Sequence, residues 1–306
     1  LEKQLISIAN FNLHNLVSPN VLYYENLSYT QEEYDIKLNW CAQQLQRMNA
    51  DIVAFQEVFH SEALQELCTR SILYKSAQIL SPHTEEDEPR IALVSRLPIV
   101  DFDSYSVLPE ELSTPYCTHF RRPPLRATVR LENNKELQIF VLHLKSKLPE
   151  YVDNESNTDL LAQAKATARS LNIRATEAVA IRTLVLAHNH LPTILVGDLN
   201  DSSHSVTTSI LKGPKPRRDF PKDTQQVFWS NRFIAANDMM HRRTRQDVSF
   251  TYIYDGYYQN IDQILLSNHF HPASVHPFGK LVYLQHFNDH LIDRSLGFPN
   301  KTPGAS

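Results

Sequence analysis

Several apolar segments of this chain end in carboxylate, amide or imidazole side chains, and the clearest of them is residues 194–200. The run 194–196 (ILV) is followed by Gly197-Asp198-Leu199-Asn200. A strand that is apolar on both sides lies between other layers, so Asp198 and Asn200 should lie at the rim of a sheet. There a carboxylate can orient a nucleophilic water, while an amide binds a phosphate oxygen or a metal ion. Taken alone, such a sequence is more often a simple Asx turn.

Two earlier segments end in the same kind of side chain. The apolar run 52–55 is followed by Gln56-Glu57, and the strand predicted from residues 5–9 continues into Asn10-Phe11-Asn12. A buried carboxylate without a partner costs free energy. Glu57 is therefore a candidate ligand for a hard cation such as Mg²⁺, which takes one or two carboxylates and keeps several waters. The alternative is a glutamate that caps a helix or pairs with an arginine.

Two further segments carry groups that suit an oxyanion. The strand predicted over 137–142 ends in His143-Leu144-Lys145. Residues two apart on a strand point to the same side, and two cations there suit a phosphate, so Lys145 is a candidate phosphate-binding residue. The ordinary interpretation of a lone His143 is a structural hydrogen bond. Asp262 lies inside the apolar run 260–266 and needs a partner, for which a histidine is the obvious candidate.

The elements that must position these groups are strands with a few helices between them. Apolar residues at steps of three and four predict helices over 31–49 and 158–190. Short strands and hairpins dominate the remainder, which predicts a four-layered α/β sandwich of two packed mixed β-sheets flanked by helices, in one domain over residues 1–306. Residues 212–247 have little periodicity and are expected to form a long loop, and residues 291–298 match the pattern of a strand poorly.

Composition and charge limit the classes of protein to which this chain can belong. The net charge of −4 over 306 residues argues against a generic nucleic-acid coat protein, although a local basic patch can still bind a nucleic acid. The three cysteines (Cys41, Cys68 and Cys117) lack metal-ligand spacing, and Cys41 and Cys68 lie on apolar faces of predicted helices as buried thiols, which favours a reducing, cytoplasmic compartment. The chain begins with Leu, so a secreted protein with a removed leader stays open. No apolar run has the length of a membrane span.

These motifs, in this order, resemble the endonuclease/exonuclease/phosphatase superfamily, which is deoxyribonuclease I-like and includes apurinic endonucleases, inositol polyphosphate phosphatases and neutral sphingomyelinases. The resemblance rests on segments spread over nearly the whole chain: Phe11-Asn12, Gln56-Glu57, residues 92–99 (ALVSRLPI), His143-Leu144-Lys145, residues 197–200 (GDLN) and residues 261–265 (IDQIL). It implies a deoxyribonuclease I-like fold with Mg²⁺ (or Mn²⁺) at the top of the two sheets, and hydrolysis of a phosphate ester by in-line attack of water.

The resemblance also implies roles for individual residues. Glu57 corresponds to the metal ligand, assisted by Asn12. Asp198 corresponds to the residue that orients or deprotonates the water, and Asn200 to a donor to the phosphate. His143 corresponds to the histidine that stabilises the phosphoryl oxygens. Asp262 corresponds to the carboxylate that supports a second catalytic histidine.

The family's closing Ser-Asp-His motif has only an approximate counterpart. Asn288-Asp289-His290 matches it in type and lies one strand and a loop after Asp262. On this assignment His290 contacts the scissile phosphate as the partner of Asp262, and Asp289 assists at the metal. The second option is that the chain is cut before a truer Ser-Asp-His beyond residue 306. Order and position favour the first.

Three functions are open at this stage. The favoured one is a Mg²⁺-dependent phosphodiesterase, acting as a monomer on DNA or RNA. The alternative is a phosphatase or phospholipase-type hydrolase of small phosphate esters or lipid head groups. A non-catalytic binding protein on the same fold is the third, and it leaves the joint presence of Glu57, His143, Asp198, Asn200 and Asp262 unexplained.

Overall fold

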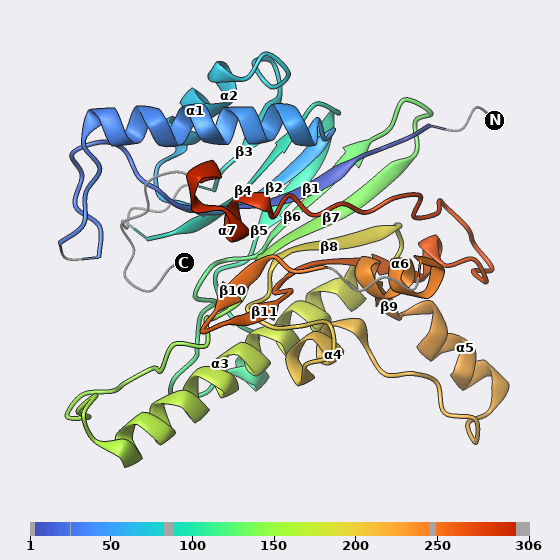
Figure 1. Cartoon of the computed structure of the whole chain (residues 1–306). Helices are drawn as coiled ribbons and strands as arrows, with labels where there is room; N and C mark the ends of the chain where they lie inside the picture. Colours follow the sequence, from blue (N-terminus) through green and yellow to red (C-terminus); the bar gives the residue numbers. More distant parts are fainter. Residues whose placement is uncertain (1–3, 25, 83–87, 245–248, 298–306) are drawn as a thin grey trace.

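Two β-sheets packed face to face form the centre of the computed structural model, which describes residues 4–24, 26–82, 88–244 and 249–297 (Figure 1). The first sheet has the order β1-β2-β4-β3 and consists of β1 (Ile8–Leu16), β2 (Ile52–Val58), β4 (Arg90–Ser95) and β3 (Gln78–Leu80). The second has the order β5-β6-β7-β8-β12-β9 and consists of β5 (Ile99–Ser104), β6 (Leu125–Arg130), β7 (Glu136–His143), β8 (Thr193–Asp198), β12 (Asp262–Ser267) and β9 (Phe233–Ala235). The pairs β1–β2 and β7–β8 are parallel and the others antiparallel, so both sheets are mixed.

Helices cover the outer face of each sheet. α1 (Gln31–Met48) and α2 (Ser61–Arg70) lie on the first sheet, and α3 (Leu160–Ala187) and α4 (Val206–Lys212) on the second (Figure 1). α1 begins with a capping box, in which Thr30 and Glu33 each bond the other's backbone N–H. The predicted four-layered sandwich is therefore confirmed, and the helices expected over 31–49 and 158–190 are α1 and α3.

Alternation along the strands divides the core into three layers. Ile52 and Ala54 of β2 face the second sheet and pack in one apolar cluster with residues of β6, β7 and β8. Val53 and Phe55 face the other way, against α1 and α2. On the far side, Phe140 and other residues of β7 and β8 pack against α3. β2, β7 and β8 therefore each separate two apolar layers, as expected for buried strands.

Strand register brings the polar residues of four strands to one place. Asn12 of β1 pairs with Gln56 of β2. In the other sheet, Asp198 of β8 pairs with His143 of β7 on one side and with Asp262 of β12 on the other. The crossover through α3 lets β7 and β8 pair in parallel, so their ends meet at the same edge.

In the C-terminal half, the expected loop over residues 212–247 is wrong, and the weak strand pattern after residue 290 is confirmed. Residues 212–247 do not form one loop, because they contain α5 (Lys222–Ser230), β9 and α6 (Ala236–Thr244). β9 has only three residues, too few for a visible period, and is stabilised by its pairing with β12. Residues 289–296 form a helical turn, α7 (Asp289–Ile292), and a 3₁₀ turn, η3 (Arg294–Leu296), in place of a closing strand. Residues 298–306 lie outside the described part.

The remaining elements are a hairpin and two short turns. β10 (Tyr252–Tyr254) and β11 (Tyr257–Gln259) pair with each other, and η1 (Glu110–Leu112) and η2 (Asn268–Phe270) are 3₁₀ turns. Cys41, Cys68 and Cys117 are buried free thiols, as predicted for the first two. Among the described residues, no helix is both long and apolar enough to cross a membrane.

Candidate active site

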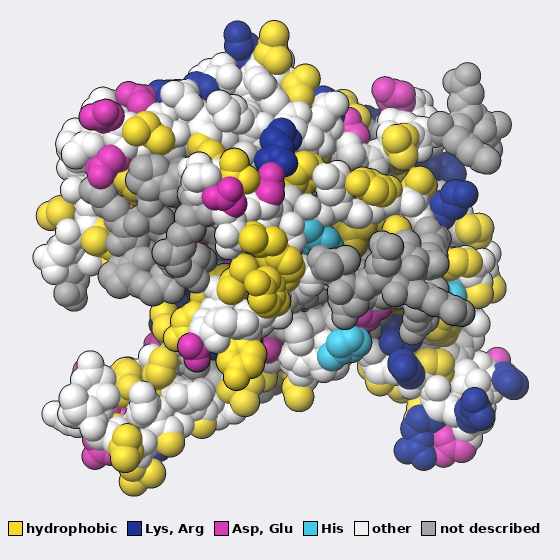
Figure 2. All heavy atoms as spheres, viewed as in Figure 1, with side chains coloured by type: hydrophobic (Ala, Val, Ile, Leu, Met, Phe, Trp, Pro, Cys, Tyr) yellow, Lys and Arg dark blue, Asp and Glu magenta, His cyan; other side chains and the backbone are white. Residues whose placement is uncertain are grey.

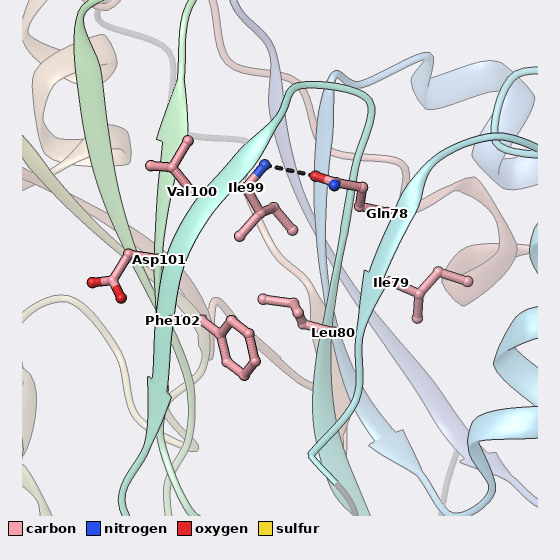
Figure 3. A pocket seen from close by; sticks show the side chains of 7 residues that line it. All are labelled: Gln78, Ile79, Leu80, Ile99, Val100, Asp101 and Phe102. Carbon is pink, nitrogen blue, oxygen red and sulfur yellow. Dashed lines mark hydrogen bonds between the residues drawn. The ribbon is translucent and has the colours of Figure 1, made fainter.

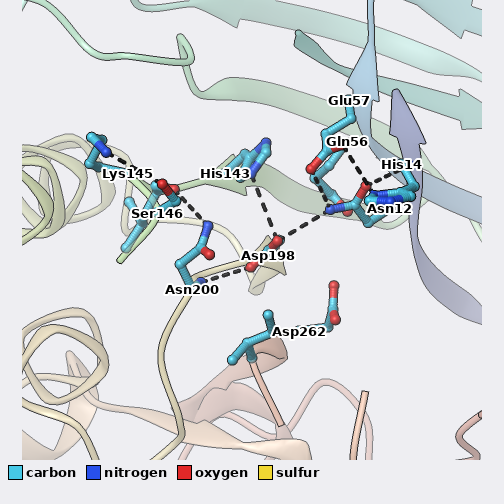
Figure 4. Close-up of polar contacts among 12 residues, drawn as sticks. Asn12, His14, Gln56, Glu57, His143, Lys145, Ser146, Asp198, Asn200 and Asp262 are labelled. Atoms are coloured by element: carbon cyan, nitrogen blue, oxygen red, sulfur yellow. Dashed lines mark hydrogen bonds and ion pairs between the residues drawn. The ribbon is translucent and has the colours of Figure 1, made fainter. Parts of the chain in front are cut away.

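One amide joins the two sheets at their polar edge. The Asn12 Nδ2 atom on β1 donates to Glu57 Oε1 on β2 at 3.1 Å and to Asp198 Oδ2 on β8 at 3.2 Å (Figure 4). Asn12 Oδ1 in turn accepts the backbone N–H of His14 at 2.9 Å, which fixes the orientation of the amide. Three residues that the sequence singled out thus share one hydrogen-bonded cluster.

Asn10 and Gln56 extend this cluster to Asp262. Asn10 Nδ2 donates to Asp262 Oδ1 at 2.7 Å, and Gln56 Nε2 donates to Asn10 Oδ1 at 2.8 Å. The sequence analysis did not select either side chain as functional. A signal was present for Asn10, because it lies two residues before Asn12 and must share its face of the strand.

Asp198, Asn200 and His143 form the other side of the cluster. The backbone N–H of Asn200 donates to Asp198 Oδ1 at 2.7 Å, and Asn200 has a left-handed φ of 52°. Its side-chain amide donates to the carbonyl of Leu144 at 3.0 Å, which ties the ends of β7 and β8 together. His143 Nε2 lies 3.8 Å from Asp198 Oδ2. Within the described residues, the buried His143 Nδ1 atom has no hydrogen-bond partner.

Burial and crowded negative charge shift the pKa values of these groups. Burial raises the pKa of Asp262 to about 6, and the charge of Glu57 acts in the same direction against hydrogen bonds from Thr251 and Asn10. Burial, followed by the charge of Asp262, raises the pKa of Asp198 well above its usual value. Burial, with a smaller effect of the Arg122 cation, lowers the pKa of His143 well below its usual value, so the imidazole is neutral at pH 7.

The donors of this cluster suit a largely hydrated Mg²⁺ ion. The described residues contain no group of three or more His, Cys, Asp or Glu side chains placed to surround a metal. Mg²⁺ does not need such a cage, because it binds one or two carboxylates and keeps its waters. Glu57, whose carboxylate shares the Asn12 amide with Asp198, provides one such ligand, and the buried carboxyl group of Asp198 beside it favours a nearby cation.

Lys145 lies apart from the cluster. β7 ends at His143, so the side-by-side arrangement expected of two strand residues does not extend to Lys145. Its Nζ atom donates to the carbonyl of Leu148 at 3.1 Å and lies 3.4 Å from Glu150 Oε2. Figure 4 shows the ammonium group directed away from Asp198. Its predicted contact with a phosphate would require this ion pair to open.

The structure does not bring Asp289 and His290 to the cluster either. The His290 ring packs edge-on against Trp40 of α1, with 5.1 Å between ring centroids. Asp289 Oδ2 accepts from Arg47 of the same helix at 2.9 Å. Asp262 is bonded to Asn10 instead of the expected histidine. The other option, a Ser-Asp-His motif beyond residue 306, stays a prediction.

Two residues of α3 that the sequence analysis did not select as functional hold the loops around the site. The buried Glu177 carboxylate accepts the backbone N–H groups of Arg121 at 2.9 Å and of Lys145 at 2.8 Å. Arg174 donates to the carbonyls of Lys145 and Ser146 at 3.2 and 3.1 Å. Glu177 was detectable, because it lies four residues from both Ile173 and Ile181 on the apolar face of a helix.

A separate groove lies between the edges of the two sheets and lacks a comparable set of polar side chains. It separates the edge strands β3 and β5, and Gln78 Oε1 accepts the N–H of Ile99 across it at 2.6 Å (Figure 3). Its lining is Gln78, Ile79, Leu80, Ile99, Val100, Asp101 and Phe102. A single carboxylate among mostly apolar side chains does not make a catalytic site, so the cluster around Asp198 remains the candidate.

Comparison with known families decides the assignment. The model of the Endonuclease/Exonuclease/phosphatase family matches residues 37–282, which include Glu57, His143, Asp198 and Asp262. The chain belongs to this family. Members of the Endonuclease/Exonuclease/phosphatase family are phosphoric ester hydrolases, and this chain is therefore one as well. No curated protein matches the chain in sequence.

Solved structures of the same fold cover most of the chain. The human Nocturnin catalytic domain with bound sulfate is 16% identical, with a TM-score of 0.52, and the match covers 86% of this chain and 83% of that one. An AP endonuclease from Archaeoglobus fulgidus is 13% identical, with a TM-score of 0.50 and coverage of 87% and 88%. A mannosyl-6-phosphatase from Bacteroides thetaiotaomicron is 15% identical, with a TM-score of 0.51 and coverage of 88% and 86%. At these identities the likeness concerns the fold alone.

Proposed function

We propose that this protein is a metal-dependent phosphodiesterase that cleaves nucleic acid. The observation that carries the proposal is the cluster in which Asn12 bridges Glu57 and Asp198, next to a neutral His143. Enzymes of the family generally use a divalent metal ion. A binding protein would gain nothing from three carboxylates crowded at one buried edge, whereas a hydrolase uses them to bind a cation and to accept a proton.

Each residue of the cluster then has a distinct task. Glu57, with the amide of Asn12, would hold Mg²⁺ or Mn²⁺, and this ion supplies Lewis-acid stabilisation of the phosphate charge when bound. Asp198 orients the attacking water and accepts its proton, for which a raised pKa is favourable. His143, being neutral, donates one N–H to a phosphoryl oxygen without needing protonation. Asn200 fixes Asp198 through its backbone N–H.

An aromatic hairpin next to the cluster favours nucleic acid as the substrate. Tyr254, Tyr257 and Tyr258 on β10 and β11 are 54%, 68% and 63% exposed. The hairpin is tied to the site, because the Thr251 hydroxyl at its base accepts the N–H groups of Ile261 and Asp262 at 3.2 and 3.1 Å. Exposed tyrosines on a rigid ribbon give nucleobases surfaces for stacking, and stacking does not depend on base sequence.

A local basic patch supports the same substrate class despite the acidic net charge. Lys and Arg side chains gather at the lower right of Figure 2, over α5 and the segment before it in Figure 1. The exposed cations of this segment are Lys215, Arg217, Arg218 and Lys222. A patch of this kind contacts a phosphate backbone without specifying sequence.

The test is hydrolysis by the purified protein with Mg²⁺ or with a chelator. The substrates are single- and double-stranded DNA, RNA, a sugar phosphate and phospholipid vesicles, so that a phosphatase or phospholipase activity is detected as well. We expect nucleic-acid cleavage that needs Mg²⁺ and that Glu57→Gln abolishes. Glu136→Gln is the matched control, because Glu136 lies at the opposite end of β7 and pairs with Arg130. Cleavage only of the sugar phosphate or the lipid would refute the proposed substrate.

The hairpin makes a sharper prediction within this assay. Loss of one base stack costs about 1–3 kcal/mol, so Tyr257→Ser with Tyr258→Ser should raise KM for single-stranded DNA by about 5-fold or more. The same variant should hydrolyse a small phosphodiester without a base at the unchanged rate. An equal loss on both substrates would remove the hairpin from substrate binding.

A further inference from the structure

The metal-ligand candidate Glu57 is held between two irregular strand segments. The register of β1 with β2 shifts between Asn12 and Leu16, and both His14 and Asn15 have left-handed φ values, 50° and 63°. β2 is irregular in its pairing with β4 between Phe55 and Val58, and Glu57 itself has a φ of 60°. Such conformations cost free energy for residues other than glycine, so the surrounding structure must stabilise them.

The irregularity decides which way Glu57 points. Val53 and Phe55 face α1 and α2, so strict alternation would direct Glu57 to the same side. Instead its Oε1 atom accepts from Asn12, which also contacts the other sheet. Its Oε2 atom accepts the backbone N–H of Asn15 at 3.0 Å. The strained segment of β1 therefore provides one of the two hydrogen bonds that fix the carboxylate.

The buried side chain of Lys37 on α1 bonds to the backbone of β1 at residues 14 and 15. The Lys37 Nζ atom donates to the carbonyls of His14 and Asn15 at 2.5 and 2.9 Å, and to the Tyr29 hydroxyl at 2.9 Å. These contacts use all three ammonium donors. The side chain is 0% exposed among apolar neighbours, a costly place for a cation. Burial lowers the pKa of Lys37 to about 8, so the ammonium form still predominates at pH 7.

We propose that Lys37 is a positioning residue for the metal site, because its bonds to the two left-handed residues of β1 direct the Asn15 N–H at Glu57 and hold that carboxylate toward the second sheet. This inference rests on the proposed function, since it assumes that Glu57 binds the metal. Apolar packing alone would be served better by a Leu or Met at this position. The carbonyls of residues 14 and 15 need a donor there, and Lys37 provides it.

Mn²⁺ binding, followed by calorimetric titration without substrate, tests the proposal. Residues that orient a metal ligand typically change affinity by about 10–100-fold when removed, and we expect a loss in that range for Lys37→Met. The matched control is Lys212→Met. Lys212 is another buried lysine, but its Nζ atom lies 3.5 Å from Asp238, away from the cluster. That variant should lose stability without losing Mn²⁺ affinity.

The outcomes separate this inference from the proposed function. A folded Lys37→Met variant that binds Mn²⁺ as tightly as the unchanged chain refutes the role of Lys37 and leaves the function intact. Absence of Mn²⁺ binding by the unchanged chain refutes the metal site and this inference with it. If Lys37→Met does not fold, Lys37→Gln decides, because it keeps a polar side chain but replaces the ammonium group, which donates to the carbonyls of residues 14 and 15, by a shorter amide with two donors. A weaker affinity in that variant supports the proposal, and an unchanged affinity overturns it.

Discussion

Asp262→Asn should stabilise the metal-free protein while it removes activity. The pKa of Asp262 rises from 3.8 to about 6 on folding, chiefly through burial, which corresponds to a cost of about 3 kcal/mol for the ionised carboxylate at neutral pH. Asparagine has the same shape and keeps an Oδ1 acceptor for Asn10, whose bond to Asp262 is 2.7 Å long. Because part of the cost remains as desolvation of the amide, we expect the free energy of unfolding to rise by about 1–3 kcal/mol, or Tm by about 2–6 °C.

The sign of the effect fixes its pH dependence. A carboxyl group with a raised folded pKa stabilises the fold fully below its unfolded pKa of 3.8, and this contribution is lost as the pH rises through about 6. The unsubstituted protein should therefore be almost as stable as Asp262→Asn at pH 4.5 and less stable than this variant at pH 7.5.

Thermal unfolding with a chelator at these two pH values is the measurement. Mg²⁺ should reverse the order at pH 7.5, because the complete cluster binds the ion and a bound ion stabilises the folded state. The prediction is wrong if Asp262→Asn is less stable than the unsubstituted protein at pH 7.5 in chelator. It is also wrong if the variant gains as much stability at pH 4.5 as at pH 7.5.

Three further predictions concern the cluster and the strands that carry it. His143→Gln should lower the turnover number by about 10²–10³-fold, since it removes a donor to the phosphate, and should leave Mn²⁺ affinity by calorimetry unchanged. Burial raises the pKa of Asp262 to about 6, and protonation of this carboxylate removes negative charge from the cluster, so apparent Mg²⁺ affinity should fall as the pH drops below that value, as measured by titration. Gly197→Ala should destabilise the fold by about 1–3 kcal/mol in thermal unfolding, because its Cβ would lie 1.9 Å from the Leu142 carbonyl oxygen. The control is Gly256→Ala, whose Cβ would meet nothing within 4 Å. This variant should lose only about 1 kcal/mol of stability, from its left-handed φ of 77°.

Local sequence patterns were sufficient to predict which strands are buried and which polar residues follow them. The apolar runs before Glu57, His143 and Asp198 can be recognised locally, since burial on both faces leaves few polar positions until the end of the strand. β1 is different, because it is only partly buried and continues beyond Asn12 to Leu16. The periods of α1 and α3 are equally local. These features, taken in their order along the chain, were enough to predict the family and the four-layered fold.

The contacts between the polar side chains could not be predicted without the packing of the two sheets. The Asn12 amide contacts Asp198 across 186 positions of sequence, which depends on how the two sheets pack. Alternation would have directed Glu57 to the helices, and the left-handed backbone held by the buried Lys37 turns it back. The position of His290 against Trp40 likewise depends on packing between distant segments. Periodicity reports which face of a strand is buried, but contacts between layers and departures from regular φ depend on long-range packing that no local pattern encodes.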